Sequence, residues 1–416
     1  MIHRRGGVLT LLGALFLVVF PHSAAGAGPD HAAVLIERLI GADGLDDVEA
    51  AYLRKLTPPL FDYLRSLCSE AEMDPLYRAG STAELRALLA KQVGPDVLDF
   101  GGGMFDYFEQ RADKGKPGAL DSWRAAVSDR FVFFYRPGSR AEEDAEFLAA
   151  SSEEALSAIL AGLDMRSEAL ENAEVLHVPR PPGSAPENDI PSAGKISVFL
   201  HPGRASAGKK FNKTMGAMSF GATILSEGAD KGAGRLTARI DVLYLNALSL
   251  AVLHHEIAHA ALFLGSFDAA PLAAEPLQGK ADLRKAFFDG YKPIPPFLQE
   301  GIGDYIFYYR VLTPRWPLLA SPGEMMKDIL GSKECIPLAK LIREGAAFRS
   351  RRRKAYSLEA ATVVDYLIRS HGPAKLKAWL LSPEKDGVGS FEKTFGYSVA
   401  ELESRWKASL LGEPGT

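Results

Sequence analysis

Residues 251–261 read AVLHHEIAHAA, and the interpretation of the whole chain depends on this stretch. His255 and His259 are four residues apart, so on a helix their side chains point the same way. Their ring nitrogens can then converge on one zinc ion. Glu256 lies about 100° further round the helix, where its carboxylate can reach a water bound to the metal. The pattern H-E-x-x-H therefore predicts two metal ligands, His255 and His259, and a general base, Glu256.

The neighbouring side chains argue against the alternative, a polar face on a solvated helix. They are Leu253, Ile257, Ala258, Ala260, Ala261, Leu262, Phe263 and Leu264. These residues leave little solvated face, so the polar groups are expected to be buried. Buried polar groups need partners, and a metal ion supplies them. His254 points elsewhere on the helix, and we interpret it as a second polar contact that does not bind the metal.

A third ligand is predicted downstream, in PPFLQEGIGDYIFYY (residues 295–309). Pro295 and Pro296 favour a helix start, which puts Glu300 early on this helix. Asp304 lies four residues later on the same face. Because ligating histidines usually donate their second N–H to a carboxylate, Glu300 is predicted as the ligand and Asp304 as the residue that orients a histidine.

Two glycines interrupt this predicted helix. Gly301 and Gly303 each cost roughly 1 kcal/mol in a helix interior. A helix that tolerates both is expected to gain close approach to a neighbour, and we predict that the neighbour is the helix of His255 and His259.

Two other carboxylates remain alternatives for the third ligand. Asp268 and Glu275 lie in GSFDAAPLAAEPLQG (residues 265–279), where no helix is predicted to aim them. Gln278 stands about 20 residues after the second histidine but is a poor zinc ligand. Glu300 is favoured because it has a helix, a proline start and Asp304 beside it.

Three motifs resemble the gluzincin metallopeptidases with a thermolysin-like catalytic domain. HHEIAHAALF (254–263) is similar to their active-site helix and FLQEGIGDYI (297–306) to their glutamate helix. AYSLEAATVVDYLIRSHGPAKLKAWL (355–380) resembles the next helix of the aminopeptidase-like branch. The resemblance implies one Zn²⁺ per chain, a tyrosine that stabilises the oxyanion, here Tyr356, and an edge strand that pairs with an extended peptide, here RIDVLYL (239–245). The 40 residues between His259 and Glu300 depart from the common spacing of about 20.

The predicted fold class is α+β. Three- and four-residue apolar spacing predicts a helical N-terminal domain over residues 28–125. A sheet-containing lobe with the active-site helix is predicted over 129–265, with strands at 131–135, 195–200 and 239–245. Residues 201–237 are interpreted as a long loop or a weak hairpin. The active-site helix is expected to begin after Asn246 and end at Gly265, before a helical C-terminal lobe over 266–416.

The N-terminus MIHRRGGVLTLLGALFLVVFPHSAAGAG indicates a secretory signal peptide over residues 1–27. A basic start precedes a short apolar run and then small residues, with Ala25–Ala27 as the cleavage site. An uncleaved anchor remains the alternative. No other stretch is predicted to cross a membrane, so no stable membrane span is expected after cleavage, and the predicted location is the bacterial periplasm or cell envelope.

Composition narrows the choice of partners. The chain has 416 residues and a formal net charge of −4, which gives no nucleic-acid signature. Its two cysteines, Cys68 and Cys335, are too few for a cysteine-rich zinc module, and they are interpreted as separate buried thiols or as one disulfide.

Together these observations predict an exported zinc metallopeptidase that acts on a peptide or protein substrate. One alternative is a non-catalytic peptide-binding or scaffold protein on the same fold. Another is a zinc amidase that acts on a non-peptide amide in the cell envelope. The motifs are compatible with both endopeptidase and exopeptidase activity.

Overall fold

The structure is a computed structural model. It describes residues 31–93, 102–111, 122–179, 181, 193–203, 216–224, 233–273, 277, 279–292, 294–318, 321–349, 353–382 and 387–412. The predicted signal peptide lies outside these residues, as do Glu275 and Gln278. The chain divides into two compact units, one of residues 1–94 and 315–318 and the other of residues 95–314 and 319–416.

The first unit is helical in the residues that the structure describes. Its helices are α2 (His31–Asp43), α3 (Asp47–Leu64), α4 (Glu70–Arg78) and α5 (Thr82–Val93). Asp46 caps α3 by accepting from two backbone N–H groups, and Glu49 returns a bond to the backbone of Asp46. Such a capping box satisfies backbone donors that the first helical turn leaves open. Cys68 in this unit and Cys335 in the other are free, half-buried thiols.

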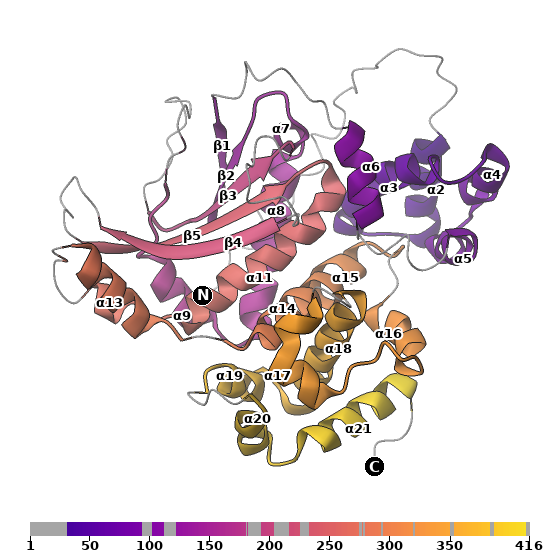
Figure 1. The fold of residues 1–416 in the computed structure, drawn as a ribbon. Coiled ribbons are helices and arrows are strands. Elements are labelled where there is room, and N and C mark those ends of the chain that lie inside the picture. The colour runs from indigo at the N-terminus through magenta and orange to yellow at the C-terminus, as the bar shows by residue number, and fades with distance from the viewer. Residues whose placement is uncertain are drawn as a thin grey trace, which may run out of the picture. The chain divides into compact units, whose positions relative to one another are not determined.

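The second unit contains a five-stranded mixed sheet (Figure 1). Its strands are β1 (Arg124–Val127), β2 (Phe131–Tyr135), β3 (Ile196–His201), β4 (Gly216–Ile224) and β5 (Gly234–Leu243). The strand order is β1-β2-β3-β5-β4; β2, β3 and β5 are parallel, and β1 and β4 are antiparallel to their neighbours. The strands predicted at 131–135 and 195–200 are thus present, and the fold is mixed α+β as predicted.

The edge strand differs from the prediction. Residues 239–243 of RIDVLYL belong to β5, which begins earlier than predicted, at Gly234, and ends at Leu243. Strand β5 is paired on both sides, by β3 and by β4. The edge next to β5 is β4, in the region interpreted as a loop or weak hairpin, and β4 pairs with β5 along its whole length, from Gly216 opposite Val242 to Ile224 opposite Gly234. The hairpin alternative is therefore correct, and the expected edge role of RIDVLYL is wrong.

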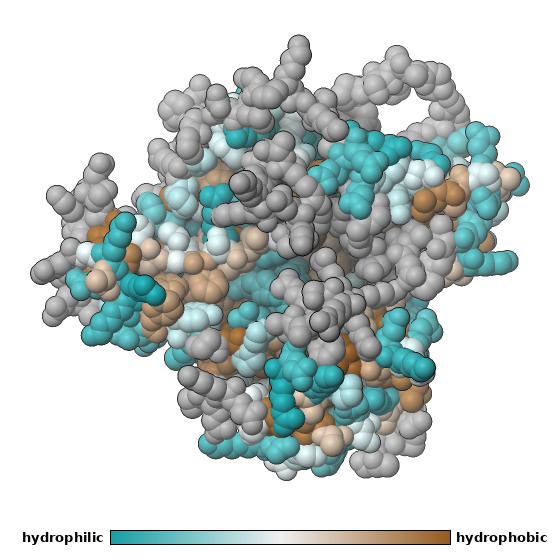
Figure 2. All heavy atoms as spheres, viewed as in Figure 1, coloured by the Kyte–Doolittle hydropathy of each residue, from teal (hydrophilic) through white to brown (hydrophobic). Residues whose placement is uncertain are grey.

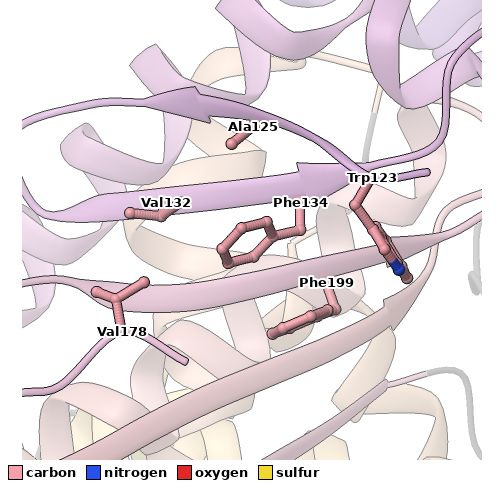
Figure 3. Packing of buried hydrophobic residues seen from close by; sticks show 6 residues of the cluster. All are labelled: Trp123, Ala125, Val132, Phe134, Val178 and Phe199. Carbon is pink, nitrogen blue, oxygen red and sulfur yellow. The ribbon is translucent and has the colours of Figure 1, made fainter. Parts of the chain in front are cut away.

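Helices cover one face of the sheet, and a cluster of apolar side chains lies on the other. Helices α8 (Ala145–Gly162) and α11 (Leu250–Ser266) pack on one face (Figure 1). On the opposite face, alternate side chains form a buried apolar cluster with the segment that follows α9 (Arg166–Ala173), as Figure 3 shows. Its members are Trp123, Ala125, Val132, Phe134, Val178 and Phe199. The sheet is thus anchored on both faces, which gives α11 a rigid support.

The described chain contains further helices. They are α6 (Gly102–Arg111), α7 (Arg140–Glu143), α12 (Ala270–Ala273), α13 (Lys280–Gly290), α14 (Pro296–Tyr305), the π-helical η5 (Ile306–Leu312), α15 (Thr313–Arg315), α16 (Pro322–Leu330), α17 (Leu338–Arg349), α18 (Arg353–His371), α19 (Pro373–Leu380), α20 (Gly387–Phe395) and α21 (Val399–Leu411). The C-terminal region is helical as expected.

One described helical stretch, Ala247–Ser266, is long and apolar enough to cross a membrane, with a mean hydropathy of 1.4. No such stretch beyond the N-terminus is predicted from the sequence, so this helix departs from the prediction by length and composition. Because 83% of this window is buried inside the fold, packing against the sheet and the neighbouring helices accounts for its apolar character. This stretch contains all three histidines of AVLHHEIAHAA, among them the two predicted ligands His255 and His259.

Candidate metal centre

Helix α11 carries the first two candidate ligands. It follows a short 3₁₀ turn, η4 (Ala247–Ser249), where the side chain of Asn246 accepts a hydrogen bond from the N–H of Leu248. This is the predicted cap. Most side chains of α11 are buried, as expected for a helix that is apolar all round.

The end of α11 lies beyond the predicted stop. Gly265 is inside the helix, which continues to Ser266. A Cβ on Gly265 would lie 2.7 Å from the Sδ atom of Met165. The glycine therefore permits close packing between segments distant in sequence and does not end the helix.

Helix α14 carries the third candidate ligand and begins at Pro296 as predicted. Glu300 and Asp304 lie one turn apart on it and are almost buried. A Cβ on Gly303 would come within 2.8 Å of Cε1 of His255. The predicted close approach to the histidine helix is therefore correct for Gly303.

Gly301 serves a different contact. A Cβ at this position would lie 3.1 Å from the carbonyl oxygen of Ala360 on α18. The two glycines thus let α14 pack tightly between α11 and α18, and this arrangement holds Glu300 against the histidines.

The donor atoms of His255, His259 and Glu300 converge. The two Nε2 atoms of the histidines are 3.0 Å apart. Glu300 Oε2 lies 3.4 Å from Nε2 of His255, and Glu300 Oε1 lies 3.8 Å from Nε2 of His259. Two ligand atoms of a tetrahedral zinc site, each about 2.1 Å from the metal, are about 3.4 Å apart. The three distances lie around this value, and the two that involve Glu300 run to its two different carboxylate oxygens.

The chemistry of the donor set also fits zinc. Two imidazole nitrogens and one carboxylate oxygen match the ligand types that zinc prefers, and three protein ligands leave a fourth position open, as in catalytic sites. Among the residues that the structure describes, His255, His259 and Glu300 form the group of side chains close enough to hold a metal ion. These are the three predicted ligands.

Asp304 orients His255. Its Oδ1 lies 3.0 Å from Nδ1 of His255, so it can accept the Nδ1–H and leave Nε2 as the metal-facing lone pair. Burial opposes a charge on His255, but the carboxylates of Asp304 and Glu300 outweigh it and raise the pKa of His255 well above its ordinary value. A proton and a metal cation would therefore compete for the same negatively charged site.

Glu256 faces the first residue of the edge strand. A Cβ on Gly216 would lie 3.0 Å from both Cγ and Oε1 of Glu256 and 2.4 Å from Cγ1 of Val252. The Glu256 side chain is almost buried, with 7% exposed. The predicted general base is thus confined between α11 and β4, next to the edge where the sheet is open among the described strands.

Tyr356 lies in the first turn of α18, where a helix was predicted to start. Its side chain is almost completely buried, with 1% exposed. Its suggested role at the oxyanion stays a prediction.

His254 differs from the expectation of a second polar contact. It is completely buried, and neither ring nitrogen has a hydrogen-bond partner among the described residues. Burial lowers its pKa to about 3, so His254 is a neutral core residue.

Of the alternative ligands, only Asp268 is among the described residues. It is exposed, and its Oδ1 accepts the backbone N–H of Ala270. Asp268 is therefore occupied in a local turn outside the converging group.

The contact between Gly216 and Glu256 is not predicted from the sequence. The small residues around Gly216 show no strand alternation, and the contact depends on the pairing of β4 with β5 and on the packing of β4 against α11.

Comparison with known proteins does not assign the chain to a group. No protein-family model matches the sequence. A search of curated proteins also finds no match.

Proposed function

We propose that this protein is an exported zinc metallopeptidase. The observation that carries the proposal is the convergence of His255, His259 and Glu300 at distances suited to one zinc ion, with Glu256 alongside. Export is proposed from residues 1–27, whose pattern is that of a signal peptide. The thermolysin-like arrangement is likewise a proposal, which the mixed α+β fold and the order of motifs support.

Each side chain has a role that its chemistry allows. The histidines present Nε2 and Glu300 presents its carboxylate to the metal, while Asp304 holds the tautomer of His255. A zinc ion held there would supply Lewis-acid polarisation of the scissile carbonyl and of an attacking water.

Glu256 acts first as the general base and then as the general acid. It accepts a proton from the water as the water oxygen bonds to the carbonyl carbon. It then delivers that proton to the departing amine as the C–N bond breaks. Its confinement beside β4 supports this role, because a peptide that pairs with the open edge would pass the carboxylate.

The test uses the full mature chain. Zinc per chain is counted by elemental analysis, and a peptide library is cleaved by the wild type and by Glu256→Gln. We expect about one zinc in each and a loss of activity on the order of 10²–10⁴-fold in the variant, the range of general-base contributions. Full activity in Glu256→Gln would disprove the mechanism. A zinc-loaded wild type that cleaves no peptide would favour the scaffold or the non-peptide amidase.

A further inference from the structure

Four aromatic rings, some stacked and some tilted, contact one another beside the edge strand. Phe220 of β4 stacks on Phe263 of α11, with ring centroids 4.3 Å apart and planes at 15°. Tyr291 lies 5.4 Å from Phe220. Phe287 of α13 stacks on Tyr291 at 6.0 Å and 9°. We call Phe220, Phe263, Phe287 and Tyr291 the aromatic platform.

The aromatic platform has an exposed side. Phe263 is buried, but Phe220 has 39% of its surface exposed. Phe288, which follows Phe287 on α13 and meets its ring edge-on, is 58% exposed. In Figure 2, hydrophobic residues, interspersed with hydrophilic ones, lie around the position of α13 in Figure 1. Contiguous exposed aromatic surface on a protein often marks a binding site.

The aromatic platform is continuous with the metal centre on two elements. Phe263 follows His259 by four residues on α11, which is about 6 Å along the helix. The side chain of Tyr291 is hydrogen-bonded to Gln299, the residue before Glu300. Both connections run through the elements that hold the proposed ligands, so the platform is fixed relative to the metal.

The edge strand links the platform to Glu256. Gly216 lies against Glu256, and Phe220 follows four residues later on β4. At about 3.3 Å per strand residue, the two positions are about 13 Å apart. An extended polypeptide that passes Glu256 along β4 therefore places a side chain over the platform within about four residues.

We propose that the aromatic platform is a substrate subsite that binds an aromatic or large aliphatic side chain. The side chain belongs to an extended polypeptide and lies within about four residues of the bond facing Glu256. The inference rests on the proposed function for the position of that bond. A polypeptide fits better than a glycan, because the backbone groups on the outer side of β4 complement another peptide strand.

The test measures binding without cleavage. Zinc-loaded full chain with Glu256→Gln is titrated with fluorescein-labelled dodecapeptides of glycine, serine and threonine that carry one Phe, or one Ser in its place. We expect about tenfold tighter binding of the Phe peptide, and loss of that preference when Phe220→Ala is added. Val127→Ala is the matched control, since Val127 is 44% exposed on the opposite edge strand β1, and it should leave the preference intact.

Two results would overturn the subsite. One is a Phe preference that Phe220→Ala leaves unchanged in a variant with normal zinc content and circular dichroism. The other is Phe220-dependent binding of a chito-oligosaccharide without binding of the Phe peptide. If Phe220→Ala does not fold, Phe220→Leu keeps the apolar contact with Phe263 and should weaken the preference severalfold.

The outcomes separate this inference from the proposed function. If wild type cleaves no peptide but Phe220-dependent binding is measured, the peptidase proposal fails and the subsite stands. If wild type cleaves peptides with a Phe preference that is independent of Phe220, only the subsite fails.

Discussion

The ring of His255 lies directly against the backbone of Gly303, where even a methyl group would come within 2.8 Å of the imidazole. We expect Gly303→Ala to displace His255 from its position beside Glu300 and to lower zinc affinity about 10- to 100-fold, as loss of outer support for a ligand does. Competition with a zinc-sensitive dye measures the change.

Two other glycines provide controls for Gly303→Ala. Gly162 lies at the end of α8, and nothing is within 4 Å of an added Cβ, so Gly162→Ala should leave zinc affinity unchanged. Gly301→Ala should crowd Ala360 on α18 and lower the midpoint of unfolding. It should lower zinc affinity less than Gly303→Ala does, because its added methyl meets α18 and not the imidazole of His255. Equal zinc affinities for Gly303→Ala and Gly162→Ala would show that close packing does not position His255.

The choice of third ligand gives a second prediction. Glu300→Ala should reduce zinc binding to less than one ion per chain at micromolar protein, because one of three protein ligands is removed. Asp304→Asn should retain zinc with affinity lowered about 10- to 100-fold, because the amide is a poorer acceptor for the Nδ1–H of His255. Elemental analysis and dye competition measure both.

Asp268→Ala is the control for the third ligand. Asp268 is an exposed carboxylate in the segment that follows α11, and its Oδ1 accepts the backbone N–H of Ala270. Its removal should leave zinc binding intact. If Asp268→Ala loses zinc and Glu300→Ala keeps it, the third ligand is Asp268 and not Glu300.

These residues also show what the sequence could predict. Glu300 and Asp304 were predicted because helical spacing, a proline start and ligand chemistry are all local properties of residues 295–309. The edge strand was predicted wrongly because pairing on both sides of β5 is a non-local property. The strongest strand pattern, RIDVLYL, belongs to an internal strand with partners on each side, whereas the edge is the glycine-rich β4. Gly265 was misread for the same reason, since its neighbour Met165 is 100 residues away.

The contact between Gly216 and Glu256 gives a third prediction. In Gly216→Ala the added methyl would overlap Val252 and crowd Glu256, so the base or the start of β4 must shift. We expect zinc content to be unchanged and kcat to fall about tenfold or more, since small misplacements of a catalytic group cost one to two orders of magnitude in rate.

Gly221→Ala is the matched control on the same strand. A Cβ on Gly221 would make only an ordinary contact, 3.5 Å from Thr237 Oγ1, so kcat should stay near that of wild type. If both variants lose the same activity, the effect reflects general weakening of β4 and not the position of Glu256.

A buried carboxyl away from the metal centre gives a fourth prediction, about pH and stability. Glu359 on α18 is completely buried, and its Oε1 accepts the backbone N–H of Ile336 at 2.8 Å. Burial raises the pKa of Glu359 to about 8, although the bond from Ile336 favours the charged form. The folded state therefore holds a proton that the unfolded chain, with the ordinary pKa of 4.5, releases at lower pH.

The sign of the pH effect follows from this difference. The contribution of Glu359 is fully present below about pH 4.5 and is lost as pH rises through about 8, because ionisation then requires a buried charge. Glu359→Gln keeps an oxygen for the N–H of Ile336 and cannot ionise. We expect it to match wild type at pH 5 and to exceed it at pH 9 by on the order of a few kcal/mol, at about 1.4 kcal/mol per pKa unit. Urea unfolding of both proteins at pH 5, 7 and 9 measures the difference, and a constant difference across this range would contradict a protonated Glu359.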